Sequence, residues 1–188
     1  MKITVWISNR HVHLSRKDAD LLFWEWYELT KIKDLSQPWQ FATEECVVLK
    51  WPKWEISKVR ILWPYRKDTQ IEILLWDNYK LGINAPVRLS GDLENTPWLE
   101  IIWPNGSITT KKWAIVAQRH IHMNLEEAKE FWLENGQIVS VKTEWERWLI
   151  FENVIIRADS KWALDFHIDM EEANAAGVKN LDECKIIK

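Results

Sequence analysis

Residues 117–124 read Ala117-Gln118-Arg119-His120-Ile121-His122-Met123-Asn124, and residues 8–15 show the same pattern as SNRHVHLS. A third, weaker copy is DFHID at residues 165–169, where Asp165 stands in the place of the first histidine. Side chains two residues apart in a strand point to the same face, so each His-x-His pair presents two imidazoles together. The repeat therefore predicts strands that carry histidines on one face.

Each copy is followed by the signal for a helix start. One apolar residue after the last histidine comes a residue typical of N-caps, and three positions later an acid followed by Ala. The caps are Ser15, Asn124 and Asp169, and the acid pairs are Asp18-Ala19, Glu127-Ala128 and Glu172-Ala173. This is the spacing of a capping box. A strand–histidine–cap–helix unit thus occurs three times, and we expect short helices over about 16–24, 125–132 and 170–176.

The rest of the chain is dominated by short runs of β-branched residues. Such runs predict strands near residues 46–49, 59–62, 70–74, 137–141 and 154–157. Many short strands with few and brief helices favour barrels or sandwiches over alternating βαβ units. The predicted fold class is therefore mainly β.

All five histidines of the chain lie in the three units: His11, His13, His120, His122 and His167. Imidazole suits zinc and related divalent ions, so these segments predict a metal site if their strands converge. The alternative is a set of structural histidines with satisfied hydrogen bonds, which is hard to reconcile with a repeated pattern. Arg10 and Arg119 point to the opposite faces of their strands, and we interpret them as structural. Asp165 is interpreted either as an acid that supports the ligands or as a solvated surface acid.

Composition limits the function classes. Hydrophobic residues make up 47% and charged residues 28%, which is typical of globular proteins, and a net charge of −3 gives no attraction to nucleic acid or anionic membranes. Cys46 and Cys184 have no metal-binding or redox spacing, and we expect reduced thiols. The N-terminus lacks a signal peptide, and no apolar run is long enough for a membrane span. We predict a cytoplasmic protein with no nucleic-acid or membrane partner.

The tryptophan content is abnormal. The chain has fifteen Trp and only five Gly, and many Trp stand at turn-like positions, for example Trp39, Trp103 and Trp145. Tight turns favour residues that tolerate positive φ, and bulky rings there strain the backbone. We interpret most of these positions as glycine positions. Trp would stand there because UGA codons, which some genetic codes read as Gly and others as Trp, were translated as Trp, or because of deliberate substitution. The alternative is a natural Trp-rich core.

The sequence resembles the PduL-type phosphate propanoyltransferase (phosphotransacylase) family over almost its whole length. Beyond the histidine repeats, the resemblance lies in the following segments: 29–31, 35–38, 64–66, 69–73, 81–88, 90–93 and 172–177. It implies two small β-barrels capped by short helices. The implied domains are residues 1–27 plus 112–188, with the N-terminal strand joining the C-terminal half, and residues 28–111.

The resemblance also implies a site with two zinc ions. One zinc would be held by His11, His13 and Glu72 and would take the sulfur of coenzyme A (CoA). The other would be held by His120, His122 and His167, with water completing its shell, and Arg66 would bind phosphate. The residues themselves agree with these roles. An unpaired Glu72 between Ile71 and Ile73 would be costly without a metal, unless it faces outward, and a guanidinium fork suits a phosphate dianion.

The implied reaction interconverts acyl-CoA and phosphate with acyl phosphate and CoA, where the acyl group is acetyl or propanoyl. The ligand set alone leaves two other functions open. One is a dinuclear zinc hydrolase, and the other is a non-catalytic protein in which zinc staples two barrels. Family members act in propanediol or acetate metabolism, some inside bacterial microcompartments. Only seven residues precede Ser8, so we expect no encapsulation extension, although a microcompartment association stays open. We expect a homodimer.

Overall fold

The structure, a computed structural model, describes residues 1–52, 54–109 and 112–187. It divides into two compact units. The first contains residues 1–9, 36–38 and 118–188, and the second contains residues 10–35 and 39–117. Each unit has its own hydrophobic core. No helix among the described residues has the length and hydropathy required to cross a membrane.

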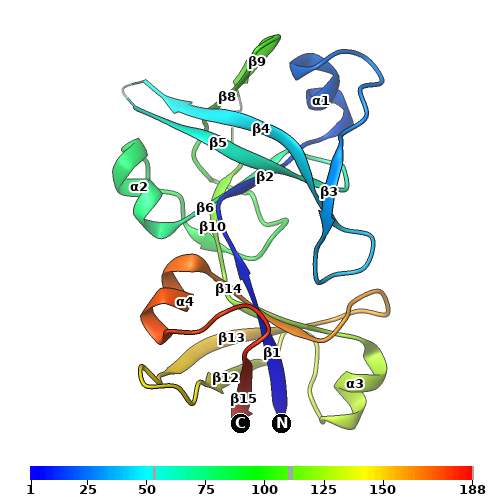
Figure 1. Cartoon of the computed structure of the whole chain (residues 1–188), viewed down its shortest axis with the longest axis vertical. Helices are drawn as coiled ribbons and strands as arrows, with labels where there is room; N and C mark the ends of the chain where they lie inside the picture. Colours follow the sequence, from blue (N-terminus) through cyan, green and yellow to red (C-terminus); the bar gives the residue numbers. More distant parts are fainter. Residues whose placement is uncertain (53, 110–111, 188) are drawn as a thin grey trace. The chain divides into compact units, whose positions relative to one another are not determined.

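The first unit is a closed six-stranded barrel (Figure 1). In order around the barrel, its strands are β1 (Lys2–Ser8), β14 (Asp165–Asp169), β11 (His120–Met123), β13 (Ile150–Ala158), β12 (Ile138–Lys142) and β15 (Glu183–Ile187). Strand β1 pairs in parallel with β14 and antiparallel with β15, so the N-terminal strand joins two C-terminal ones. The helices of this unit are α3 (Leu125–Glu130) and α4 (Met170–Ala176).

The second unit is a nine-stranded sheet. Its main path is β7 (Val87–Arg88), β10 (Ala114–Ala117), β6 (Gln70–Ile73), β2 (His11–His13), β5 (Trp54–Trp63), β4 (Phe41–Trp51), β8 (Glu100–Trp103) and β9 (Gly106–Thr109), and β3 (Lys31–Asp34) pairs with β4. Its helices are α1 (Arg16–Leu22) and α2 (Leu75–Leu81). The prediction of a mainly β chain with short helices is confirmed. The closed barrel is in the first unit, and the second unit is an extended sheet.

The two units share one strand plan. Along the path β1-β14-β11-β13-β12-β15 the successive pairs are parallel, antiparallel, parallel, antiparallel and antiparallel. The path β10-β6-β2-β5-β4-β8 has the same order of pairs. In this alignment β11 corresponds to β2, and β14 corresponds to β6. The repeat seen in the sequence therefore belongs to equivalent places in two equivalent sheets.

Strand β6 and helix α2 form a fourth copy of the repeated unit. The helix begins after Leu74, and its third residue, Asp77, accepts a hydrogen bond from the Leu74 N–H at 3.0 Å. This is the bond that Glu127 and Glu172 make to their own caps. The copy was missed from the sequence because Leu74 has no side-chain acceptor and therefore does not look like a cap. Each unit thus holds two copies: β2–α1 with β6–α2, and β11–α3 with β14–α4.

Several tryptophans have a backbone conformation that favours glycine. Trp26, Trp39, Trp113 and Trp132 have φ values of 66°, 64°, 141° and 55°. Of the three positions named from the sequence, Trp39 has this strained conformation, whereas Trp103 and Trp145 do not. Trp26, Trp113 and Trp132 were not singled out from the sequence.

Trp132 is the clearest of these residues. It lies eight residues after its helix cap Asn124, just as Gly82 and Gly177 lie eight residues after Leu74 and Asp169. In all three helices, the N–H of the next residue bonds back to the carbonyl four residues after the cap, at 2.9 to 3.1 Å. This is the Schellman bond that follows a left-handed residue. Trp132 therefore occupies a glycine position.

Candidate metal centres

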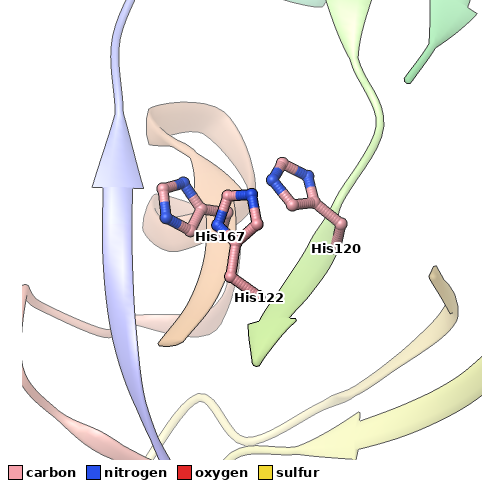
Figure 2. Close-up of side chains that lie close together, drawn as sticks. All are labelled: His120, His122 and His167. Carbon is pink, nitrogen blue, oxygen red and sulfur yellow. The ribbon is translucent and has the colours of Figure 1, made fainter. Parts of the chain in front are cut away.

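Three histidines of the first unit form one group. His120 and His122 lie on β11, and His167 lies directly opposite His120 on the antiparallel strand β14. Each offers a ring nitrogen within 4.8 Å of the others, and the ring centroids are 4.6 to 5.0 Å apart. Figure 2 shows the three imidazoles clustered beside the two strands. The alternation of the strands explains this arrangement, because Ile121 and Phe166 point the other way into the core.

The second unit holds an equivalent group on its equivalent strands. His11 and His13 lie on β2, and Glu72 on β6 is paired directly opposite His11. All three side chains are buried, their ligand atoms lie within 4.8 Å of one another, and Glu72 Oε2 is 3.4 Å from His11 Nε2. An outward-facing Glu72 is therefore wrong. Within each unit, the structure brings together the three residues that the sequence assigned to one group.

Burial sets the protonation of these groups. Desolvation lowers the pKa of His13 and His120 well below the ordinary value, and it lowers that of His122 to about 4. Burial alone would raise the pKa of Glu72, but His11, His13 and Arg66 together more than offset this, and the pKa falls well below its usual range. Near neutral pH these histidines are neutral and the carboxylate is ionised, which are the forms that bind a metal ion.

Asp165 belongs to the surroundings of the histidine group. The side chain is buried, so its interpretation as a solvated surface acid is wrong. Its carboxylate contacts rings of both His122 and His167, at 3.3 and 2.9 Å. Burial alone would raise the pKa of Asp165, but these two bonds hold it below its ordinary value.

The two arginines beside the histidine pairs make ion pairs with helix-capping acids, in keeping with the structural role expected from the sequence. Arg10 donates to both carboxylate oxygens of Asp77 at 2.7 and 3.0 Å, and Arg119 lies 3.2 Å from Glu172. Each acid is the capping acid of the helix that follows the partner strand. The arginine that precedes β2 or β11 thus ties the start of that strand to the helix of the neighbouring copy.

Arg66 lies beside the second unit's group. Its Nη2 is 2.9 Å from His13 Nε2, and its Nη1 donates to Ser90 Oγ at 2.5 Å. Its backbone N–H donates to the Leu14 carbonyl, at the end of the histidine strand. The guanidinium is half-buried and is held at two points, next to a candidate metal ligand. A fixed planar fork in this position suits a tetrahedral oxyanion.

Two polar residues near the groups were missed from the sequence. Gln37 is buried and donates to Asp165 Oδ2 at 2.7 Å. Gln70 is buried and donates to Glu72 Oε1 at 2.5 Å. A glutamine in a loop or a strand carries no spacing signal, so Gln37 could not have been found without the structure. Gln70 could have been found by aligning residues 70–72 with residues 165–167. Gln70 stands two residues before Glu72, just as Asp165 stands two residues before His167.

The chain is similar over its length to known proteins of one family. The family model described as phosphate propanoyltransferase matches residues 4–179. The chain is 48% identical over 187 residues to a phosphate propanoyltransferase of Thermotoga maritima, covering 99% of this chain and 89% of that protein. It is also 48% identical over 187 residues to one of Rhodopseudomonas palustris, covering all of this chain and 83% of that protein. A phosphate propanoyltransferase of Clostridioides difficile is 46% identical, over 99% of this chain and 89% of its own length. The chain therefore belongs to the phosphate propanoyltransferase family and is an acyltransferase.

Proposed function

We propose that the chain interconverts acyl-CoA and phosphate with acyl phosphate and CoA, with acetyl or propanoyl as the acyl group. Its relatives are named phosphate propanoyltransferase. The observation that supports the proposal most directly is the contact between Arg66 and His13, 2.9 Å from Nη2 to Nε2. It combines an oxyanion-binding fork with a group of metal-type ligands.

The two groups fit zinc, two ions per chain. Three imidazoles in one unit, and two imidazoles with a carboxylate in the other, are donor sets that zinc accepts in enzymes. The buried ring atom His122 Nε2 has no hydrogen-bond partner among the described residues. Asp165 faces Nδ1 of the same ring, so Nε2 carries the lone pair. Buried polar atoms rarely lack a partner, and a bound cation would satisfy this one. In the proposal, His120, His122 and His167 hold one zinc, and His11, His13 and Glu72 hold the zinc that takes the CoA sulfur.

The reaction proposed is a direct displacement. A phosphate oxygen attacks the thioester carbonyl carbon, a C–O bond forms, the C–S bond breaks, and the sulfur leaves as a thiolate. Arg66 orients the phosphate, and its bond to Ser90 helps to keep the fork in place. When bound, zinc lowers the pKa of a thiol and offsets negative charge on oxygen. In the reverse direction the CoA thiolate attacks the acyl phosphate.

An acyl-enzyme is not part of the proposal. Cys184 lies in the hydrophobic core of the first unit. The Ser15 hydroxyl is used in the cap of α1, where it donates to Asp18 at 2.7 Å. Initial-rate kinetics with both substrates varied should give intersecting lines, because both must be bound before transfer. Parallel lines and an isolable acyl-protein would contradict direct displacement.

The test of the function is thioester formation from propanoyl phosphate and CoA by the zinc-loaded chain. We expect activity that a chelator removes and zinc restores, and that His120→Ala and His13→Ala each abolish. Acetyl phosphate in parallel gives the acyl preference. Phosphate release without CoA would instead support a zinc hydrolase. Zinc binding without either reaction would support a purely structural role.

The remaining predictions concern organisation. The domain bounds expected from the resemblance, residues 1–27 plus 112–188 and residues 28–111, differ from the two compact units, in which residues 10–27 and 112–117 belong to the second unit. We propose that the two compact units act as the two domains of the enzyme. The homodimer can be tested by light scattering on the purified chain, and the cytoplasmic location by fractionation.

A further inference from the structure

One position next to each metal group is occupied by a buried polar residue rather than by a ligand. Asp165 is paired opposite His122 across β14 and β11, and Gln70 is paired opposite His13 across β6 and β2. Each stands two residues before the third member of its group, His167 or Glu72. The strand plan thus places Asp165 and Gln70 at equivalent positions in the two units.

We propose that Asp165 and Gln70 are equivalent positioning residues, each matched by its hydrogen-bonding chemistry to the ligands that it holds. The inference rests on the metal-binding part of the proposed function. It assigns a role to two residues that are not themselves members of either ligand group.

Asp165 has the chemistry needed to hold imidazoles. A carboxylate only accepts hydrogen bonds, so the His122 Nδ1 that faces Asp165 Oδ1 at 3.3 Å carries the proton. The lone pair of that ring is then on Nε2, the buried atom that has no hydrogen-bond partner in the described part of the chain. Asp165 Oδ2 contacts His167 Nε2 in the same way at 2.9 Å, which leaves Nδ1 of that ring as the acceptor. One carboxylate therefore selects the tautomers of two ligands.

Gln37 holds this carboxylate in place. Its Nε2 donates to Asp165 Oδ2 at 2.7 Å and to the Ala163 carbonyl at 2.9 Å, and its Oε1 accepts from the Ala163 N–H at 3.0 Å. The amide is thus fixed by the backbone two residues before Asp165. Its third bond aims the carboxylate at the histidines.

Gln70 has the opposite chemistry, and its ligand requires it. Its Nε2 donates to Glu72 Oε1 at 2.5 Å and to Ser90 Oγ at 2.8 Å, while its Oε1 accepts from the Gly91 N–H at 2.7 Å. The bond from Gln70 occupies Oε1 of Glu72. The other carboxylate oxygen of Glu72, Oε2, lies 3.4 Å from His11 Nε2. A carboxylate at position 70 would instead repel Glu72. An acceptor therefore supports imidazoles, and a donor supports a carboxylate.

Two near-isosteric exchanges test this matching. Asp165→Asn puts a donor beside the imidazoles, and Gln70→Glu puts an acceptor beside Glu72. Loss of an outer-shell partner weakens metal binding by about 10–100-fold. We expect Asp165→Asn to lose that factor in zinc affinity at the three-histidine group alone, and Gln70→Glu to lose it at the His11, His13 and Glu72 group alone. Zinc affinity and stoichiometry are measured by competition with a chromophoric chelator.

Each variant contains its own folding control, because the second group should still bind zinc with wild-type affinity. A separate readout is the tautomer of the metal-free histidines, measured by long-range ¹H–¹⁵N NMR. We expect His122 as the Nδ1–H form in the wild type and a mixture in Asp165→Asn. Packing changes alone would not alter that ratio.

The outcomes separate this inference from the proposed function. A wild-type chain that binds two zinc ions, with both variants unchanged in affinity, would overturn the positioning roles and leave the function standing. Equal weakening at both groups in either variant would also overturn them, because it indicates general destabilisation. A wild-type chain that binds no zinc would overturn the metal centres themselves.

Discussion

Replacing Trp132 by glycine should stabilise the protein. A non-glycine residue with left-handed backbone costs about 1–2 kcal/mol, and Trp132 has φ 55° at the end of α3. The side chain is 85% exposed, so its removal sacrifices little buried surface. The greater freedom of glycine in the unfolded chain offsets about 0.5–1 kcal/mol of the gain. We expect the free energy of unfolding to rise by about 1 kcal/mol and Tm to rise by about 2–4 °C.

Two controls separate backbone strain from the loss of the ring. Trp132→Ala removes the ring but keeps a Cβ, so it should gain almost nothing. Gly82→Ala adds a Cβ at the equivalent position of α2, where φ is 72°. The added Cβ would meet no neighbouring atom within 4 Å, so this variant should lose about 1 kcal/mol of stability through backbone strain alone. Urea unfolding followed by circular dichroism measures all three variants. If Trp132→Gly is no more stable than Trp132→Ala, the glycine-position argument is wrong.

Three further predictions follow from side chains described above. Arg66→Lys keeps the charge but loses the guanidinium fork, so the KM for phosphate should rise. The value of kcat/KM should fall by about 10–150-fold, which corresponds to about 1.5–3 kcal/mol for a lost charged hydrogen bond. An unchanged KM for phosphate would contradict phosphate binding by Arg66. Burial raises the pKa of the Cys184 thiol to about 11, so at pH 8 a thiol reagent should modify Cys46 in the folded protein and Cys184 only after denaturation, as mass spectrometry of labelled peptides would show. Burial also raises the pKa of Glu172 from 4.5 to about 7. As pH rises, Glu172 loses its proton in the unfolded chain before it does so in the folded protein. The free energy of unfolding of the wild type should therefore fall by up to about 3 kcal/mol relative to that of Glu172→Gln between pH 4.5 and 7. Parallel curves of stability against pH for the two proteins would refute this.

The histidine groups were predictable from the sequence because their ligands are local. His120 and His122 lie on one strand, and the helix cap at Asn124 marks the end of that strand. Consecutive residues therefore indicate both the strand face that carries the histidines and the point where the strand ends. The pairing that brings His167 opposite His120 is long-range, and strand propensity does not specify register. Glu72 came from the family resemblance, since its copy of the repeat lacks a polar cap at Leu74. Gln37 depends on a loop conformation that no periodicity encodes.

The pairing of two copies in each unit has a consequence for coordination number. Antiparallel neighbours such as β11 and β14 are related by a local twofold axis, which exchanges position 120 with 167 and position 122 with 165. Perfect symmetry of a His-x-His strand would surround the axis with four imidazoles. Four protein ligands fill the tetrahedral shell of zinc and make a purely structural site. Asp165 in one unit and Gln70 in the other break that symmetry at the same position. Each candidate group therefore has three metal-type side chains rather than four. In the proposed zinc sites this leaves a coordination position for a substrate atom.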